Sequence, residues 1–109
     1  MRVWDISPSR LCRNHLLAEH REIHAIWSIL VLKKKGFSTH PETLRWKGKL
    51  RALYLRHESV VEEFEKRGYR HNSPLDRSLA RGTSVQDVYL VPPKFQLRIL
   101  KLKKCDCKV

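Results

Sequence analysis

A stripe of apolar residues with helical spacing runs through the N-terminal third of the chain. Its members lie three, four or seven residues apart and are Leu16, Ile23, Trp27 and Leu30. Residues with this spacing share one face of an α-helix, so the stripe predicts an amphipathic helix that continues to about Lys34. Gly36 follows a run of three lysines, and both features favour a helix C-terminus. Before this helix we expect a short extended segment over residues 1–6, and a helical turn opened by Ser7-Pro8-Ser9.

A second stripe of the same kind lies in the middle of the chain. It consists of Leu50, Leu53, His57, Val60 or Val61, and Phe64, and Gly68 ends it. Glutamates occupy the other side of the pattern, which predicts another amphipathic helix facing a core. Just upstream, Pro41-Glu42 behind Thr39 or His40 is typical of a helix start, and Gly48 is a candidate interruption.

The last third of the chain is more polar. Turn residues dominate from Tyr69 to Asp87, so we expect mostly loop there, with one short turn around Leu79. Pro92-Pro93 can begin a final helix with Phe95, Ile99 and Leu102 on one side, although a strand is the alternative. The fold class we predict is all-α: a small single-domain bundle of about three helices over residues 1–109, with an extended N-terminal segment, long polar loops and a basic tail at about 101–109.

The amino-acid composition adds the expectation that the protein binds an anionic partner. The chain has 109 residues with 23 Lys and Arg against 11 Asp and Glu, a formal net charge of +12. Nucleic acid or an acidic membrane face would satisfy such a charge, but no apolar run approaches the ~18 residues of a spanning helix. The three cysteines do not form the paired framework of a small secreted domain. We therefore expect a cytoplasmic, nucleoid-associated monomer that does not bind membranes.

Candidate chemistry is concentrated in the segment from Asn14 to Glu22. On a helix, His15, Glu19 and Glu22 fall on one face beside the apolar stripe, at the edge of the core. Partial burial would make these groups tunable. The alternative is that they only solvate the helix and form weak pairs worth ~0.2 to 0.5 kcal/mol each.

Two segments resemble a known family. Met1-Arg2-Val3-Trp4, together with His15-Leu16-Leu17-Ala18-Glu19-His20-Arg21-Glu22, is similar to the N-terminal segment of the phage-type pyrimidine-dimer DNA glycosylases, also called phage-type endonuclease V, without a gap over residues 1–23. A looser likeness covers residues 50–69, where Glu65-Lys66-Arg67-Gly68-Tyr69 looks like the end of that family's middle helix.

The resemblance implies an enzyme of DNA repair that needs no cofactor and no metal. It places the nucleophile, the N-terminal α-amine, on Met1 and the essential carboxylate on Glu22. It implies that Arg2 and Arg21 hold phosphates beside the lesion and that His15 contacts substrate or orients the site. The implied substrate is double-stranded DNA carrying damaged pyrimidines, which the enzyme kinks while it flips out a nucleotide opposite the lesion.

The chemistry implied for Met1 is physically reasonable. An α-amine has a reference pKa of about 7.7 to 8.0 against about 10.4 for lysine, so a useful fraction is unprotonated near neutral pH. Attack at the sugar C1′ would displace the base, and the resulting imine would permit β-elimination, which makes the protein a glycosylase and an abasic-site lyase. Three departures from the family stand out. Bulky Arg2 should leave Met1 in place, and Ala25 replaces a DNA-contacting arginine. The chain also ends in Lys103-Lys104-Cys105-Asp106-Cys107 instead of the family's aromatic, basic tail.

Many cations could contact phosphates. The candidates are Lys33, Lys34, Lys35, Arg45, Lys47, Lys49, Arg51 and Arg56. Three tryptophans, Trp4, Trp27 and Trp46, could stack on an exposed base. Trp27, however, belongs to the apolar stripe and is better placed in the core.

Two other functions remain open from the sequence. The first is a non-catalytic, basic, helical nucleic-acid-binding protein with the same surface. The second is a metal-dependent nuclease built on His15, His20 and His24, although no third ligand follows from the spacing of the His20-His24 pair. Cys105 and Cys107 could join a metal or redox site, but with no second cysteine pair we expect a disordered tail.

Overall fold

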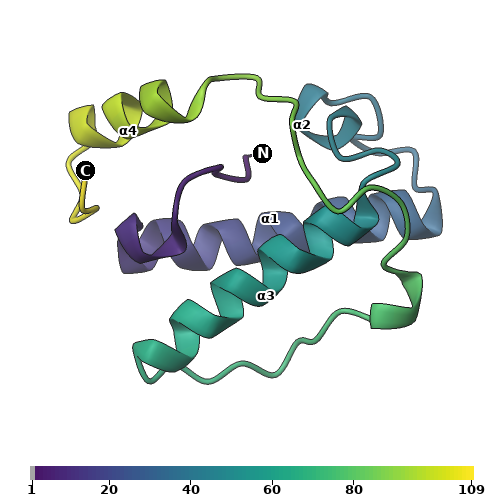
Figure 1. The fold of residues 1–109 in the computed structure, drawn as a ribbon, viewed down its shortest axis with the longest axis horizontal. Coiled ribbons are helices and arrows are strands. Elements are labelled where there is room, and N and C mark those ends of the chain that lie inside the picture. The colour runs from purple at the N-terminus through teal and green to yellow at the C-terminus, as the bar shows by residue number, and fades with distance from the viewer. Residues whose placement is uncertain (1) are drawn as a thin grey trace.

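Two long helices, α1 (Arg13–Leu32) and α3 (Leu50–Lys66), form the framework of the protein in a computed structural model that describes residues 2–109. They pack against each other through the predicted stripes (Figure 1). The buried residues of these two faces include Leu16, Ile23, Ile26 and Trp27 on α1 and Leu53, His57, Val60 and Phe64 on α3. Both amphipathic predictions are therefore confirmed.

Four shorter elements complete the described chain. They are the 3₁₀ turns η1 (Pro8–Arg10) and η2 (Arg77–Leu79) and the helices α2 (Pro41–Leu44) and α4 (Pro93–Leu102). Residues 2–109 contain no strand and only one isolated β-bridge, between Lys49 and Gly82. The all-α prediction is confirmed, and the last element is a helix. None of the described helices is long and apolar enough to cross a membrane.

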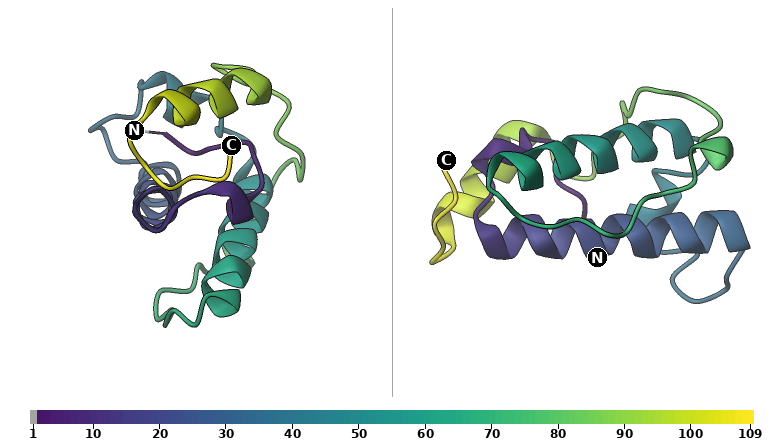
Figure 2. Two further views of the ribbon diagram at one scale, coloured as in Figure 1. Left: turned by 90° about the vertical axis from the view of Figure 1, so that its left-hand side faces the viewer. Right: turned by 90° about the horizontal axis from the view of Figure 1, so that it is seen from below.

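The extended N-terminal segment lies inside the molecule. It runs between α1 and α4 (Figures 1 and 2), and the side chains of Val3, Trp4 and Ile6 belong to the core. A segment that looks like a lead into the first helix is thus a central element, covered from both sides.

The C-terminus of α1 differs from its prediction. The helix ends at Leu32, and Lys33 takes the left-handed conformation (φ 52°) that Gly36 was expected to supply. The backbone N–H of Lys33 and of Lys34 both donate to the Ile29 carbonyl, which satisfies the end of the helix. The lysine accepts a conformation that a glycine would adopt with less strain.

The N-terminus of α3 is capped by a distant loop. No side chain caps it; instead the N–H groups of Arg51 and Ala52 donate to the carbonyls of Arg81 and Thr83 at 2.9 and 3.1 Å. Here Gly82 (φ 88°) crosses the backbone of Gly48 so closely that any Cβ would collide with it. The polar loop after α3 is therefore tied to the start of that helix.

The buried face of α4 is not the predicted one. Phe95 and Leu102 are 42% and 86% exposed, whereas Gln96 and Leu100 are buried at 4% and 1%. Gln96 is buried because its amide makes specific hydrogen bonds, a contribution that hydrophobic periodicity does not register.

The basic tail is docked, contrary to the expectation of disorder. The N–H of Lys108 donates to the Arg10 carbonyl at 2.7 Å, and the side chains of Cys107 and Val109 pack against the core. Both Figure 1 and Figure 2 place this end of the chain beside η1 and the start of α1.

Candidate active site

Three successive backbone N–H groups near the start of the chain are held by side chains from three different helices. The pairs are Val3 to Glu42 Oε1 (3.0 Å), Trp4 to Glu19 Oε1 (2.7 Å) and Asp5 to Gln96 Oε1 (2.8 Å). An extended segment normally leaves such donors to a neighbouring strand or to water. Here buried acceptors on α2, α1 and α4 hold the segment in one position.

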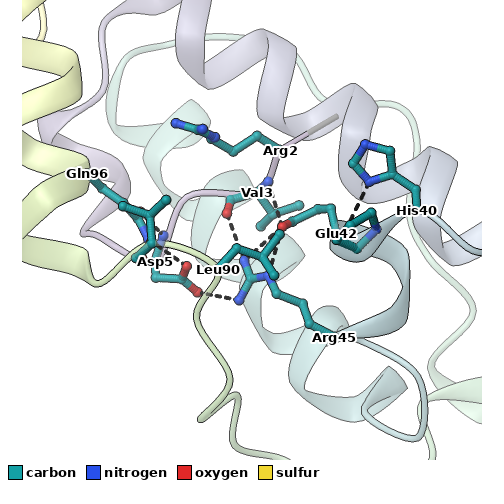
Figure 3. A pocket seen from close by; sticks show the side chains of 10 residues that line it. Arg2, Val3, Asp5, His40, Glu42, Arg45, Leu90 and Gln96 are labelled. Carbon is teal, nitrogen blue, oxygen red and sulfur yellow. Dashed lines mark hydrogen bonds and ion pairs between the residues drawn. The ribbon is translucent and has the colours of Figure 1, made fainter.

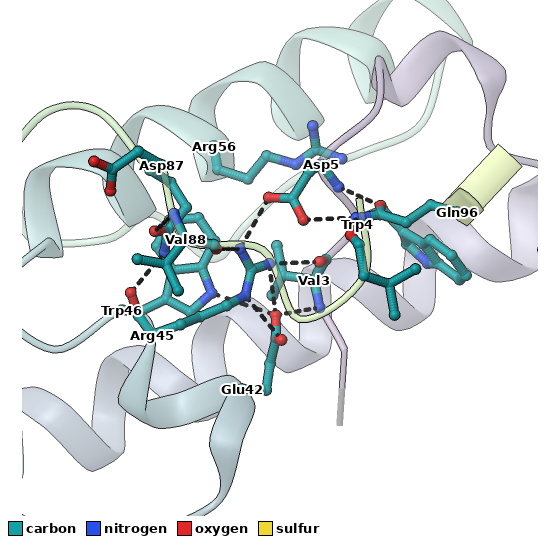
Figure 4. A network of polar contacts seen from close by, with 12 residues as sticks. Val3, Trp4, Asp5, Glu42, Arg45, Trp46, Arg56, Asp87, Val88 and Gln96 are labelled. Atoms are coloured by element: carbon teal, nitrogen blue, oxygen red, sulfur yellow. Dashed lines mark hydrogen bonds and ion pairs between the residues drawn. The ribbon is translucent and has the colours of Figure 1, made fainter. Parts of the chain in front are cut away.

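The first of these acceptors belongs to a buried ion-pair network (Figure 4). Arg45 donates to both carboxylate oxygens of Glu42 at 2.8 and 2.9 Å, to Asp5 Oδ1 at 3.0 Å and to the Val3 and Val88 carbonyls at 2.9 Å. Burial alone would lower the pKa of Arg45, but the hydrogen bonds and charges of Glu42 and Asp5 raise it. Arg45 therefore stays charged and anchors the N-terminal segment.

The second acceptor, Glu19, is also fully engaged. Its carboxylate receives two bonds of 2.9 Å from Arg56, whose remaining Nη1 donates to the Ile6 carbonyl. Burial raises the pKa of Glu19, and the charge of Arg56 opposes that rise. Of the two carboxylates predicted on one face of α1, Glu19 is thus structural, whereas Glu22 forms no ion pair with any of residues 2–109.

Glu22 lies at a cavity of about 650 Å³. The cavity is lined by residues of α1 and of the segment that follows it, including Ala25, Ser28, Lys34, Phe37 and His40. This volume is in the range of sites that hold small ligands. Ala25 lies on its wall, where the resemblance leads one to expect an arginine.

His40 lines two cavities. One is the Glu22 cavity, and the other is a cavity of about 210 Å³ whose wall includes Arg2 and Val3 (Figure 3). His40 caps α2: its Nδ1 accepts the Glu42 N–H at 3.1 Å, so the ring proton of the neutral side chain is on Nε2. The sequence indicated His40 only as a possible helix cap, and its place between the two cavities could not be predicted.

Four lysines form a basic wall beside the Glu22 cavity. Lys33, Lys34, Lys35 and Lys47 line a third cavity of about 460 Å³, and Lys34 lines the Glu22 cavity as well. These lysines are exposed, as are Arg2, Arg21 and Arg51.

Two predicted phosphate contacts are wrong, and a third cation, Lys49, is engaged within the protein. Arg45 and Arg56 are bound by carboxylates in the interior, as described above. Lys49 is largely buried, and its Nζ is bound by Gln86 and Asp87, both at 2.8 Å. The suggestion of base stacking by tryptophan is wrong too, because the side chains of Trp4, Trp27 and Trp46 are buried in the core.

The other predicted site residues are divided between different places. His15 lies beside Cys12 and Cys107, whereas His20 and His24 lie with His57 and His71. The structure thus does not bring His15, His20 and His24 together as a nuclease site would require. Met1 lies outside the described residues.

Comparison with known proteins identifies a family. A family model described as pyrimidine dimer DNA glycosylase matches residues 1–77, which span the N-terminal segment and helices α1, α2 and α3. Searches of curated proteins and of solved structures give no match.

Proposed function

The chain belongs to the pyrimidine dimer DNA glycosylase family, and we propose that it excises damaged pyrimidines from duplex DNA and cleaves the resulting abasic site through an imine on its N-terminal α-amine. The observation that carries this proposal is that residues 3–5 are held in place beside the cavity that Arg2 and His40 line, and that His40 also lines the Glu22 cavity.

Fixing these backbone atoms has a chemical purpose in the proposal. In the proposal the reacting α-amine is that of Met1, and the three hydrogen bonds at residues 3–5 fix the segment that follows it. A nucleophile restricted in this way loses little freedom when it attacks, which is a large part of the rate gain available from positioning. The buried charges of Glu42 and Arg45 thus serve catalysis by anchoring the chain and need not touch DNA.

The proposed reaction proceeds in two stages. The unprotonated amine attacks C1′ of the damaged nucleotide, the bond to the base breaks, and the base leaves with the bonding electrons. Opening of the sugar ring then converts the new C–N bond into an imine, which makes the hydrogen on C2′ acidic. Loss of that proton expels the 3′ phosphate by β-elimination, and hydrolysis of the imine releases the protein.

Glu22 and His40 have complementary roles in this scheme. The carboxylate of Glu22 stabilises the positive charge that develops on the sugar as the base leaves, and it can accept the proton from C2′. His40, with its proton on Nε2, can donate a hydrogen bond to the departing base or to a phosphate oxygen. Arg2 and Arg21 are proposed to bind the phosphates that flank the lesion.

Phe37 is suited to hold a base at the mouth of the Glu22 cavity. Its side chain is 69% exposed, and its backbone adopts φ 58°, a conformation that bulky residues rarely take. Strain of this kind is maintained by the surrounding structure and is common at functional sites. An exposed aromatic ring there can stack on a flipped nucleotide, an interaction worth about 1–3 kcal/mol per base.

Reductive trapping tests the imine. Duplex DNA with a cyclobutane dimer or an abasic site, mixed with the protein and borohydride, should yield a covalent protein–DNA adduct, and peptide mass analysis should place it on the N-terminal residue. A one-residue N-terminal extension should keep DNA binding but move or abolish the adduct. No adduct from protein with a verified free N-terminus, or an adduct on a lysine, would contradict the proposed mechanism.

The basic wall predicts a change in salt dependence. Replacing Lys34 and Lys47 together with alanine should weaken binding to duplex DNA and reduce the slope of log K against log salt concentration by roughly 2, because each phosphate contact releases about one counterion. Fluorescence anisotropy over a salt series measures the slope. Lys66→Ala is the control, since Lys66 is an exposed residue on α3 whose Nζ pairs with Glu62 at 3.5 Å. Equal slopes for all three proteins would remove the basic wall from the interface.

A further inference from the structure

The C-terminal tail and the start of α1 bring together three cysteines and a histidine. One ligand atom from each of Cys12, His15, Cys105 and Cys107 lies within 4.8 Å of all the others. Cys12 is the N-cap of α1, His15 is in its first turn, and the other two belong to the segment after α4. These are ends of the chain that only the fold makes neighbours.

The distances within this cluster are close to those of a tetrahedral metal site. Nδ1 of His15 lies 3.0 Å from Cys12 Sγ and 3.3 Å from Cys107 Sγ. Zinc bonds of about 2.3 Å to sulfur and 2.0–2.1 Å to nitrogen place tetrahedral ligands roughly 3.5 Å apart. The N–H of Cys12 also donates to Cys107 Sγ at 3.1 Å, the kind of hydrogen bond that supports a metal-bound thiolate.

We propose that Cys12, His15, Cys105 and Cys107 bind one Zn²⁺ ion. Three soft thiolates and one imidazole form a ligand set that is characteristic of structural zinc, which fills all four positions. Binding exchanges three thiol protons, released to solvent, for four bonds to the metal, and no electron is transferred. A disulfide would use only two of the cysteines and would not involve His15.

Such an ion would fasten the tail to the body of the protein. The tail carries Lys103, Lys104 and Lys108 on a chain that is already strongly positive, so like charges oppose its docking. The ion would also join the end of α4 to the start of α1. Because Gln96 on α4 holds the Asp5 N–H, this clamp would help to position the N-terminal segment.

Four histidines form a second, independent cluster between α1, α3 and the segment after α3. One ring nitrogen from each of His20, His24, His57 and His71 lies within 4.8 Å of the other three, with Nε2 pairs at 3.1 Å (His20 to His71) and 3.2 Å (His24 to His57). The segment that carries His71 passes along the α1–α3 pair (Figure 2, right). Tetrahedral zinc–nitrogen bonds place such nitrogens about 3.4 Å apart.

The residues around the four histidines favour the binding of a cation by their imidazoles. His57 is fully buried, and its Nδ1 lies 3.0 Å from Glu58 Oε1, which keeps the proton on Nδ1 and the Nε2 lone pair directed into the cluster. A carboxylate behind a histidine is the usual support of a metal ligand.

We infer that His20, His24, His57 and His71 form a second binding site for a divalent transition metal, with Zn²⁺ as the ion that suits four imidazoles in a tetrahedron. Apolar side chains would fill this position between two helices at a lower cost in free energy than four polar rings. His24 also lines the Glu22 cavity. The second ion would therefore stiffen the part of α1 that carries Glu22.

Metal analysis of the full chain tests both sites. The protein should be purified without a histidine tag, by cation exchange, and its metal content measured by mass spectrometry. We expect two zinc ions per chain. Cys105→Ser with Cys107→Ser should lose one, and His20→Ala with His71→Gln should lose the other, so each double variant is the control for the second. Circular dichroism shows whether each variant is folded.

Cobalt substitution separates the sites without any variant. Co²⁺ bound by thiolates shows charge-transfer absorption in the near ultraviolet, which four imidazoles cannot produce. We expect that band in the wild-type protein, together with visible bands of tetrahedral cobalt.

Different results would overturn the two proposed sites. Absence of the charge-transfer band, zinc retained by the cysteine variant, or a thiol count showing a disulfide would overturn the first site. Zinc content unaffected in a folded histidine variant, or only one zinc ion in the wild type that the cysteine variant loses, would overturn the second.

Discussion

Replacing Glu22 with glutamine is expected to slow base excision by about 10²–10³-fold, the loss typical when a group that stabilises transition-state charge is removed. The amide has nearly the same shape as the carboxylate but carries no charge and cannot accept the C2′ proton. Glu22 lies on the wall of its cavity and has no ion-pair partner within residues 2–109, so the substitution should leave the fold intact. Single-turnover cleavage of the glycosyl bond in a dimer-containing duplex, followed as alkali-labile strand scission, measures the effect.

Binding provides the control for this prediction. Removing a negative charge beside DNA should leave affinity unchanged or raise it, so the loss must appear in the rate and not in binding. Glu62→Gln is the matched variant, because Glu62 is 67% exposed in its side chain on α3, and it should react at the wild-type rate. If Glu22→Gln excises bases as fast as the wild type, the role proposed for this carboxylate is wrong, and a non-catalytic DNA-binding function becomes the better explanation.

Replacing Glu42 with alanine is expected to reduce the free energy of unfolding by about 3–5 kcal/mol, the usual result of removing one partner of a buried ion pair. The substitution leaves Arg45, whose side chain is 2% exposed, with Asp5 as its only carboxylate partner among residues 2–109, and it removes the acceptor of the Val3 N–H. Urea denaturation followed by circular dichroism measures the loss.

The same variant has a second, functional consequence. With the Val3 N–H released, the start of the chain should become less ordered, and imine trapping should slow under conditions in which the protein is still folded. Glu62→Ala is the control, since an exposed pair such as Glu62 and Lys66 contributes only ~0–1 kcal/mol. A Glu42→Ala protein as stable as Glu62→Ala would show that the network does not anchor the N-terminal segment.

The parts of the fold that were predictable are those that neighbours in the sequence encode. The stripes of α1 and α3 require only that residues three and four apart share a helix face. That rule even placed His57 in the interior. Proline at the start of α2 and of α4 acts through its own fixed φ angle, so these helix starts were also predictable.

The errors have a common physical origin. Arg45, Lys49 and Arg56 look like surface cations, and their burial follows from acidic and polar partners 37 to 40 residues away in the chain. Gln96 lies in the interior for the same reason, since it binds Asp5. Charge and hydropathy are properties of single residues, whereas the cost of burial depends on the partner that the fold supplies.

The candidate site also combines features that the sequence could predict with features that only the structure shows. Resemblance to a family could assign Glu22 to chemistry, and helical spacing could place Glu19 on the same face. Only the structure shows that Glu19 is occupied by Arg56 and the Trp4 N–H. His40 could be predicted as a helix cap. That it lies between the cavities of Arg2 and Glu22 depends on how α2 packs beside α1.

By itself, then, the sequence determined the helical class, the two long amphipathic helices and the strong positive charge that a DNA-binding family requires. The tertiary structure decided which charges are free, how the N-terminal segment is held, and which cysteines and histidines meet. The reason is that helix formation depends on side chains one turn apart, which produce a periodic pattern in the sequence. Ion pairs and metal-ligand clusters join residues that are far apart in the chain, such as Cys12 and Cys107, and their separation produces no such pattern.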